Sequence, residues 1–399
     1  MPLRLPPLRP GHGLQLLEGS AELFPALVAD IDAAAHEVWL ETYILDFGGA
    51  SAEVAWALER AARRGVSVRI AVDGFGTPML PASWRERFDQ AGVQWEVYAP
   101  VGSLGVVWPG SWRRLHRKLC VVDGHAAYCG GINLLDDLLD PNHGRLDYPR
   151  LDFAVRVSGP IVADVREAMA VLWQRMRAVH RLDPHALAEA LRPLPRGAST
   201  AAAPGASAAR AALLLRDNLR HRRQIEKSYL RAIGRAQQEI IIANAYFVPG
   251  GRLRRALMRA ARRGVRVMLL LQGRYEYFMQ YYASRPVYDA LLKAGVEIHE
   301  YEASFLHAKV AVFDGRVATV GSSNLDPLSL LLAREANVIV DDPEFGELLR
   351  RRLLHAIEHH GRVMDAAQYA SRPWRERALE WLALAVMRVA LAVQGKKYL

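Results

Sequence analysis

The pattern of hydrophobic and polar positions repeats itself along this chain at a separation of about 200 residues. The segment Glu59–Gly74 (ERAARRGVSVRIAVDG) resembles the segment Met258–Gly273 (MRAARRGVRVMLLLQG). In both segments a helical pattern stops at a glycine, Gly65 or Gly264, and an apolar run rich in β-branched residues and Leu follows. This pattern predicts a helix that ends at a C-terminal glycine and leads into a buried strand.

Two further pairs of segments match in the same order. Glu37–Leu45 resembles Glu239–Val248, and Gln90–Tyr98 resembles Lys293–Tyr301; all four are strand-like. Three ordered matches indicate the duplication of a whole domain, because a solenoid unit is much shorter. Each half then runs strand, helix, strand, helix, strand. We therefore expect an α/β fold of two pseudo-symmetric domains, each a mixed, largely parallel sheet flanked by helices.

The expected domain boundaries follow from this duplication. The first domain is predicted at 14–182 and the second at 213–365. The segment 183–212 between them is predicted as a mobile linker, because much of it is rich in Ala, Pro, Gly and Ser and has no apolar period. Residues 366–399 are predicted as an amphipathic C-terminal helix.

That helix allows two interpretations. Its apolar stretch Pro373–Val393 carries Trp374 and Trp381, is interrupted by Arg388, and is too short for a comfortable membrane span. It could lie in a membrane surface with the two C-terminal lysines beside the headgroups. It could equally pack on the protein core or on another subunit.

Composition narrows the classes of protein. A length of 399 residues favours two domains, and 51% hydrophobic with 24% charged residues excludes a mostly disordered chain. Only Cys120 and Cys129 occur, which excludes a disulfide scaffold and a four-cysteine zinc site. Prolines near the N-terminus argue against a signal peptide. The net charge of +10 favours nucleic acid, phosphorylated metabolites or an anionic membrane as partners, although an Arg-rich genome would also raise it.

The candidate chemistry lies in one motif that occurs once in each half. Leu115–Asn133 and Leu306–Asn324 both read His-x-Lys, four residues, Asp-Gly, five residues, and then Gly-Gly-x-Asn or Gly-Ser-x-Asn. A single His-x-Lys-x4-Asp match by chance has a probability of roughly 1 in 100 for this composition. Two matches in the two duplicated halves are therefore a strong signal.

Strand periodicity predicts how each motif is arranged. His116 and Lys118 are two residues apart and should point to one face of a strand. Asp123-Gly124 is a favoured hairpin turn, so a second strand should return and bring Asn133 near the same edge. The other copy repeats this arrangement. As turn formers, Asp123 and Asp314 need no catalytic role, and we favour a structural or charge-orienting role for them. A purely structural role is harder to accept for a lysine on an apolar strand, because a buried ammonium group needs a partner.

These two motifs resemble the paired HKD motifs of the phospholipase D superfamily. The chain is similar in particular to the bacterial cardiolipin synthase branch, in its short form without N-terminal membrane helices. The resemblance implies two phospholipase D-like domains whose motifs meet across a pseudo-twofold interface in one active site, with no metal or organic cofactor. The catalytic residues that it implies are His116, Lys118, Asp123, His307, Lys309 and Asp314, and the phosphate-binding or supporting residues are Asn133, Asn324, Ser322, Gly130, Gly131, Asp152 and Glu335. Gly131 departs from the family, where many members carry Ser.

The implied reaction proceeds through a phosphohistidine. One neutral imidazole attacks phosphorus, and the other, protonated, donates to the leaving alkoxide; the resemblance suggests His116 as nucleophile and His307 as acid and base, although the sequence alone does not separate them. Family members hold each histidine with a carboxylate about thirty residues further on. Glu335 lies 28 residues beyond His307 and Asp152 lies 36 beyond His116, so we expect these same-half pairs.

Function is expected at the level of phospholipid chemistry. The first hypothesis is transfer of a phosphatidyl group between two phosphatidylglycerol molecules, which gives cardiolipin and glycerol. The alternatives are phospholipid hydrolysis, an HKD nuclease acting on DNA or RNA, and a catalytically silent membrane scaffold. The first hypothesis implies an anionic phospholipid membrane as partner, no nucleic acid, and a peripheral location on the cytoplasmic face of the bacterial inner membrane. Aromatic segments at 105–112 and 275–282 could form an acyl-chain groove beside the site.

Overall fold

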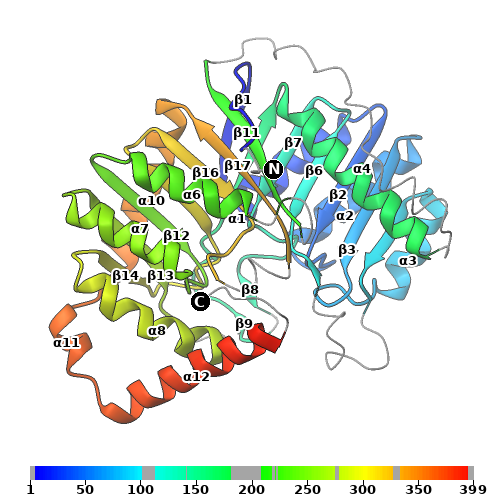
Figure 1. The fold of residues 1–399 in the computed structure, drawn as a ribbon. Coiled ribbons are helices and arrows are strands. Elements are labelled where there is room, and N and C mark those ends of the chain that lie inside the picture. Colours follow the sequence, from blue (N-terminus) through cyan, green and yellow to red (C-terminus); the bar gives the residue numbers. More distant parts are fainter. Residues whose placement is uncertain are drawn as a thin grey trace.

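The computed structural model describes residues 5–100, 113–140, 142–180, 208–217, 221, 223–274, 278–326 and 333–393. These residues form two lobes, one from each half of the chain, and each lobe contains a large sheet covered by helices (Figure 1).

The first lobe has a seven-stranded sheet. In spatial order its strands are β1 (Gly13–Glu18), β10 (Phe153–Ser158), β7 (Ala126–Gly130), β6 (Lys118–Val122), β2 (Glu37–Thr42), β3 (Ser67–Asp73) and β4 (Gln94–Tyr98). Its helices are α1 (Gly19–Asp32), α2 (Ser51–Arg63), α3 (Ala82–Ala91) and α4 (Ile161–His180). A small separate hairpin joins β8 (Leu139–Asp140) to β9 (Gly144–Arg145).

The second lobe has a nine-stranded sheet that includes a short strand from the first half. Its path runs β11 (Arg210–Arg216), β17 (Ala333–Asp341), β16 (Val317–Gly321), β15 (Lys309–Phe313), β12 (Glu239–Asn244), β13 (Arg266–Gln272), β14 (Glu297–Tyr301) and β18 (Gly361–Val363), and β5 (Arg114–Leu115) pairs with β17. Its helices are α6 (Gln224–Arg235), α7 (Gly251–Arg262), α8 (Phe278–Leu292), α10 (Pro343–His360), α11 (Ala366–Ala370) and α12 (Trp374–Val393).

The duplicated segments form equivalent elements in the two lobes. Strands β2, β3 and β4 pair in parallel, as do β12, β13 and β14, and helices α2 and α7 connect the first two strands of each set. Gly65 and Gly264 both take the left-handed conformation, at φ +92° and +89°, where a residue with a side chain would be strained. Apart from the short parallel pair of β5 and β17, the remaining pairs are antiparallel, so each sheet is mixed, with a larger antiparallel share than the strand–helix alternation suggests.

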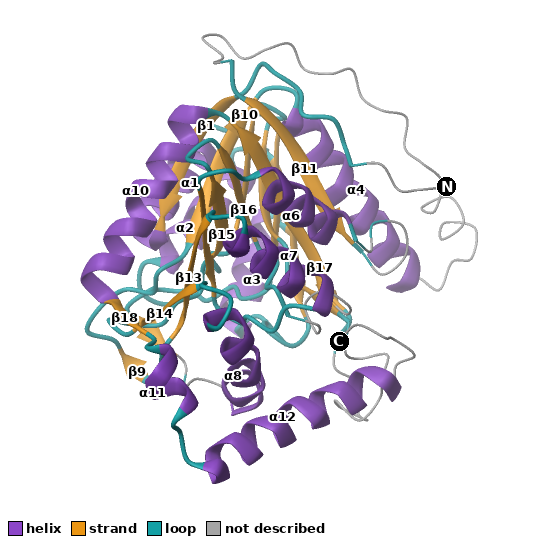
Figure 2. Cartoon of the chain, turned by 60° about the vertical axis from the view of Figure 1, so that its left-hand side comes forward, coloured by secondary structure: helices purple, strands orange, loops and turns teal. Residues whose placement is uncertain are grey.

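The two lobes share one hydrophobic core. Trp39 and Phe153 of the first sheet, Ile241 and Val338 of the second, and apolar residues of α4 and α10 belong to one cluster of buried side chains. Side chains that alternate with these along the strands face α1–α3 in one lobe and α6–α8 in the other. In Figure 2 the strands accordingly occupy the centre of the molecule and helices lie around them. The inner strands of the two sheets are therefore held close together, which is where the two motifs lie.

Two predicted boundaries can be compared with the structure. Strand β11 begins at Arg210, so 210–212 belong to the second sheet and not to the predicted linker, while 181–207 lie outside the described residues. Helix α12 packs along α8, with Ala383 and Leu384 buried, but it exposes Trp381 and Leu382 by 54% and 60%. None of the helices described reaches the length and apolarity that crossing a membrane requires.

Candidate active site

Each motif forms the predicted hairpin. Strand β6 begins at Lys118 and β15 at Lys309, and each histidine lies two residues before its strand. Arg117, between His116 and Lys118, points the other way and forms a buried ion pair with Glu41 at 2.7 Å. The hairpin turns place Asp123 and Asp314 at φ +49° and +52°, each followed by a glycine that also has positive φ. The alternation of side chains along His-x-Lys and the turn at Asp-Gly therefore match the arrangement that the sequence predicts.

The two motif aspartates lie at the far end of the hairpins from the histidines. The carboxylate of Asp123 accepts hydrogen bonds from the backbone N–H groups of residues 35–37, at 2.7–2.8 Å. The carboxylate of Asp314 accepts equivalent bonds from residues 237–239. Each aspartate therefore fastens the turn to the start of the neighbouring strand, β2 or β12, and holds the hairpin in register. Their place in the catalytic set is not supported by this position, because they do not reach the histidines.

Backbone hydrogen bonds join the two halves at the histidines. The N–H group of His116 donates to the carbonyl of Arg334 at 3.0 Å, and the N–H group of His307 donates to the carbonyl of Leu151 at 2.9 Å. Arg334 directly precedes Glu335, and Leu151 directly precedes Asp152. Each histidine is thereby aligned with a carboxylate from the opposite half.

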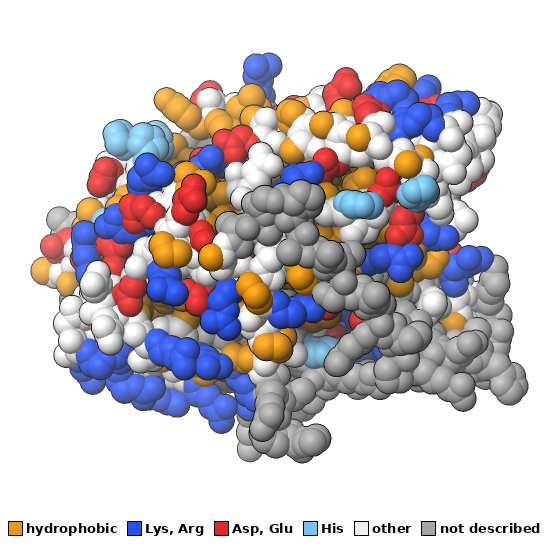
Figure 3. Space-filling view, turned by 90° about the horizontal axis from the view of Figure 1, so that it is seen from above, with side chains coloured by type: hydrophobic (Ala, Val, Ile, Leu, Met, Phe, Trp, Pro, Cys, Tyr) orange, Lys and Arg blue, Asp and Glu red, His pale blue; other side chains and the backbone are white. Residues whose placement is uncertain are grey.

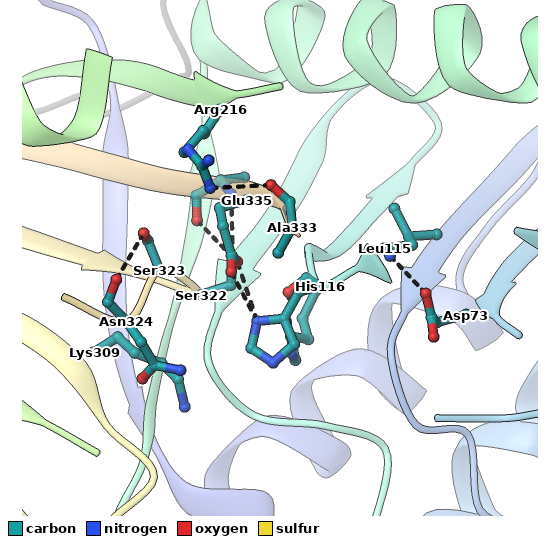
Figure 4. A network of polar contacts seen from close by, with 12 residues as sticks. Asp73, Leu115, His116, Arg216, Lys309, Ser322, Ser323, Asn324, Ala333 and Glu335 are labelled. Atoms are coloured by element: carbon teal, nitrogen blue, oxygen red, sulfur yellow. Dashed lines mark hydrogen bonds and ion pairs between the residues drawn. The ribbon is translucent and has the colours of Figure 1, made fainter. Parts of the chain in front are cut away.

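The side chains follow this crossed alignment. Nδ1 of His116 lies 3.1 Å from the Glu335 carboxylate, and Nδ1 of His307 lies 2.6 Å from Oδ2 of Asp152. Figure 4 shows the first pair, with Ser322 beside Glu335. The expected same-half pairs are therefore wrong: Glu335 contacts His116 and Asp152 contacts His307. The spacing rule identified the correct carboxylates but not their partners, because β7 and β10 of the first sheet lie against β16 and β17 of the second, and each carboxylate extends across that junction.

The two carboxylates occupy equivalent positions with different neighbours. Ser322 donates its hydroxyl hydrogen to Glu335 at 2.5 Å, and the same hydroxyl oxygen accepts the N–H of Ala336. At the equivalent Gly131, a Cβ atom would lie 2.3 Å from Oδ1 of Asp152. The Asp152 carboxylate therefore occupies the space that a serine side chain would need, which explains why this half carries glycine. At Gly130 a Cβ atom would come within 2.6 Å of Ala154, so this strand pair also needs a glycine.

Both motif lysines are buried beside the histidines. Lys309 is fully buried and Lys118 is 6% exposed. The ammonium group of Lys118 donates to the carbonyl of His116 at 2.9 Å, and that of Lys309 donates to the carbonyl of His307. Burial, reinforced by the positive charge of Lys309 and opposed by the charge of Glu335, lowers the pKa of Lys118 from 10.5 to about 7. The site therefore places two buried lysines close to each other and to the carboxylates of Glu335 and Asp152.

The same environment changes the titration of the histidines and of Asp152. Burial lowers the pKa of His116, although the neighbouring Glu335 opposes this shift. Burial and the positive charges of Lys309 and Lys118 lower the pKa of His307 well below 6.5. Burial raises the pKa of Asp152 to about 7. Both imidazoles are thus held neutral near pH 7 in the absence of an anion, and each Nδ1 faces a carboxylate, which leaves Nε2 for chemistry.

The motif asparagines lie at the ends of the returning strands. Oδ1 of Asn133 accepts the N–H of Ile44 at 3.3 Å, which leaves its amide N–H groups as donors on the other side. Asn324 is buried, and Figure 4 shows it beside Lys309. The motif histidines and lysines, with Asn324, are therefore gathered where the sheets meet, whereas both Asp-Gly turns lie at the far end of the hairpins.

Three residues near the site were missed by sequence reasoning. Asp73 at the end of β3 accepts the N–H of Leu115 at 2.6 Å, and Gln272 at the end of β13 accepts the N–H of Leu306 at 2.8 Å. Each fixes the residue that precedes a motif histidine. The sequence contained a signal for both residues, because the repeated segments Glu59–Gly74 and Met258–Gly273 end on Asp-Gly and Gln-Gly at equivalent positions. Tyr43, whose ring centroid lies 5.2 Å from that of His116, had no such signal.

Two other expectations concern the surroundings of the site. The aromatic segment 105–112 lies outside the described residues, as do residues 275–277 of the second segment, and α8 begins at Phe278. Among the described side chains, no three or more His, Cys, Asp or Glu residues are grouped in a way that could hold a metal ion.

Comparisons with known proteins agree with this geometry. The family model described as "Cardiolipin synthase, PLD-like domain" matches residues 27–144 and 229–356, one match in each half. Cardiolipin synthase B of Salmonella typhimurium is 37% identical over 391 residues, which cover 97% of this chain and 90% of that protein. Cardiolipin synthase A of Cronobacter sakazakii is 30% identical and covers 93% of this chain and 74% of that protein.

Solved structures extend the similarity to the fold. The crystal structure of phosphatidylserine synthase from Haemophilus influenzae matches with a TM-score of 0.70 at 12% identity, over 97% of this chain and 95% of that one. An identity this low bears on the fold alone. The matching family model, the extent of the curated relatives and the paired motifs lead to one conclusion: this chain belongs to the cardiolipin synthase family of phospholipase D-like proteins.

Proposed function

We propose that this protein is a phosphatidyltransferase that moves a phosphatidyl group from one phosphatidylglycerol to another and releases glycerol. The observation that carries the proposal is the pair of crossed histidine–carboxylate contacts beside two buried lysines. A phosphodiester is an anion, so a site with two buried cations compensates for its loss of hydration. The curated relatives with the name cardiolipin synthase support this choice of substrate.

The first half-reaction uses the neutral state of the imidazoles. Nε2 of His116 attacks phosphorus, the bond from phosphorus to the glycerol oxygen breaks, and His307 transfers its proton to that oxygen. His307 needs a proton for this step, although its pKa is lowered in the free protein. The negative charge of the bound phosphodiester offsets the positive charges of Lys118 and Lys309 and raises the pKa of His307 when substrate is present. Protonation of the acid is thus coupled to substrate binding.

The second half-reaction reverses these roles. His307, now neutral, takes the proton from a hydroxyl group of the second phosphatidylglycerol, whose oxygen attacks phosphorus and breaks the bond to His116. Lys118, Lys309, Asn133 and Asn324 supply positive charge and hydrogen bonds to the phosphoryl oxygens. The carboxylates of Glu335 and Asp152 hold the two rings by Nδ1 and stabilise the imidazolium forms.

We assign the protein to the surface of an anionic membrane on its cytoplasmic face. Helix α12 supports this assignment because one side of it packs on the protein while other side chains remain available to a membrane surface. It packs on α8 through Ala383 and Leu384, yet it exposes Trp374 by 73%, Trp381 by 54% and Val386 by 50%. Exposed tryptophans on an otherwise anchored helix are typical of a segment that lies at the headgroup level.

The proposal is tested with purified protein and vesicles of labelled phosphatidylglycerol. Mass spectrometry should detect cardiolipin and an equal amount of glycerol from the wild type and neither from His116→Ala. Phosphatidic acid as the main product would show that the protein hydrolyses phospholipids and does not transfer phosphatidyl groups. Nicking of plasmid DNA without any lipid product would show that the protein is a nuclease.

A further inference from the structure

An arginine-rich hollow lies between α6 and α7 on the second lobe. Its volume is about 390 Å³, and Arg252, Arg255, Arg259 and Arg263 surround an apolar floor that includes Ile233, with Gly234 at its side. The space-filling view shows Lys and Arg side chains gathered along the edge of the molecule where α6 and α7 lie (Figure 3). The hollow contains none of the motif residues.

The positive charge of this hollow is not neutralised by the described residues around it. Neither Arg252, Arg255 nor Arg259 forms an ion pair with a described residue. Arg263 donates to the backbone carbonyls of Ile233 and Ala236, at 3.1 and 3.3 Å, and not to a carboxylate. Several guanidinium groups around one hollow repel one another, so an anion between them would relieve that repulsion.

The first half of the chain shows what this hollow lacks. Arg64 donates to the carbonyls of Ile31 and Ala34, at 2.9 and 3.4 Å, in the same way that Arg263 donates to those of Ile233 and Ala236. These matched bonds make Arg64 equivalent to Arg263. The residue after Ile31 is Asp32, whereas the residue after Ile233 is Gly234.

Asp32 neutralises the equivalent arginines of the first half. Its carboxylate accepts two hydrogen bonds from Arg60, at 3.0 and 2.7 Å, and lies 3.8 Å from Nη1 of Arg64. In the second half the matching arginines are retained and the carboxylate is replaced by Gly234. A Cβ atom at Gly234 would meet nothing within 4 Å, so the space of the missing side chain is open.

A further change adds to the charge of the hollow. By the register of the repeat, Glu53 of α2 corresponds to Arg252 of α7, and Trp56 corresponds to Arg255. The second half has thus replaced one carboxylate by glycine, a second by arginine, and an aromatic residue by another arginine. An Arg-rich composition alone does not explain why both acidic residues are lost around the same hollow.

We infer that the hollow between α6 and α7 is a second anion site, separate from the active site, that binds a phosphate group in the position where Asp32 lies in the first half. Guanidinium groups bind phosphate oxygens in pairs, and the apolar floor suits the carbon skeleton next to a phosphate. The phosphate can belong to a lipid headgroup or to a soluble phosphate compound.

Gly234→Asp tests this inference because it restores the carboxylate of the first half, and Gly234→Asn is the matched control of equal size without the charge. Gly234 does not have positive φ, so both side chains fit the helix. Binding of the full chain is measured by sedimentation with phosphatidylglycerol vesicles against phosphatidylcholine vesicles, and by calorimetry with inorganic pyrophosphate. Gly234→Asp should weaken binding of at least one anionic probe by about tenfold, and Gly234→Asn by far less.

The probes identify the source of the phosphate. Weaker binding of vesicles alone indicates a lipid headgroup, and weaker binding of pyrophosphate indicates a soluble compound. Unchanged binding of both probes, or equal losses in the Asp and Asn variants, would overturn the inference. Cardiolipin formation at saturating substrate should be unaffected in either variant, so failure of this site and failure of the proposed function give different results.

Discussion

Replacing Glu335 by Gln separates the crossed arrangement of the active site from the same-half arrangement that sequence spacing suggests. The carboxylate lies 3.1 Å from Nδ1 of His116, and it keeps a second contact, to Ser322, that a glutamine can also make. The substitution therefore removes one charge with little change in shape. A hydrogen bond to a charged group contributes about 1.5–3 kcal/mol, so we expect turnover to fall by about 10- to 100-fold.

Loss of turnover alone does not say which histidine has lost its partner, so the assay must resolve individual residues. Diethyl pyrocarbonate modifies neutral imidazole, and mass spectrometry of the digested protein reports the rate at each histidine. In Glu335→Gln the ring of His116 becomes less basic and should react more slowly, while His307 should react as in the wild type. Asp152→Asn should give the opposite pattern, because Asp152 contacts His307.

A matched control and a clear contrary outcome complete this experiment. Glu347 forms an ion pair with Arg350 at the protein surface, so Glu347→Gln removes the same charge without reaching the site. It should leave both histidine rates unchanged. If Glu335→Gln slowed the modification of His307 and spared His116, the crossed pairing would be refuted and the same-half pairing restored.

The remaining predictions concern four other positions. His307→Ala should reduce turnover by roughly a thousandfold without changing the melting temperature, and near-normal turnover would contradict a shared site. Because Lys118 has a pKa of about 7, it is cationic below that pH and neutral above it, so kcat/KM should fall as the pH rises between about 6 and 9, and Lys118→Arg should flatten this limb. Gly131→Ser should displace Asp152 and reduce turnover by about 10- to 100-fold, measured beside the melting temperature, and wild-type turnover would refute the steric argument. Trp381→Ser should weaken vesicle flotation by about tenfold and spare activity on a soluble diester, and unchanged flotation would remove α12 from the membrane surface.

Local pattern by itself determined much of this protein. The spacing of His116 and Lys118 indicated a common face, and Asp123-Gly124 indicated a hairpin turn, because both depend only on strand periodicity and on the conformations open to a few adjacent residues. The glycine stops at Gly65 and Gly264 followed from the same kind of local rule. The duplication was also legible, because equivalent elements retained similar apolar patterns.

Only the tertiary structure decided which carboxylate serves which histidine. His116 and Glu335 are 219 residues apart and His307 and Asp152 are 155 apart, so no local period relates the members of either pair. Their pairing depends on how the two sheets meet, which is set by the shared core and by the backbone bonds at Arg334 and Leu151. The lowered pKa values have the same origin, because burial of two lysines side by side is a property of the assembled halves and not of either motif.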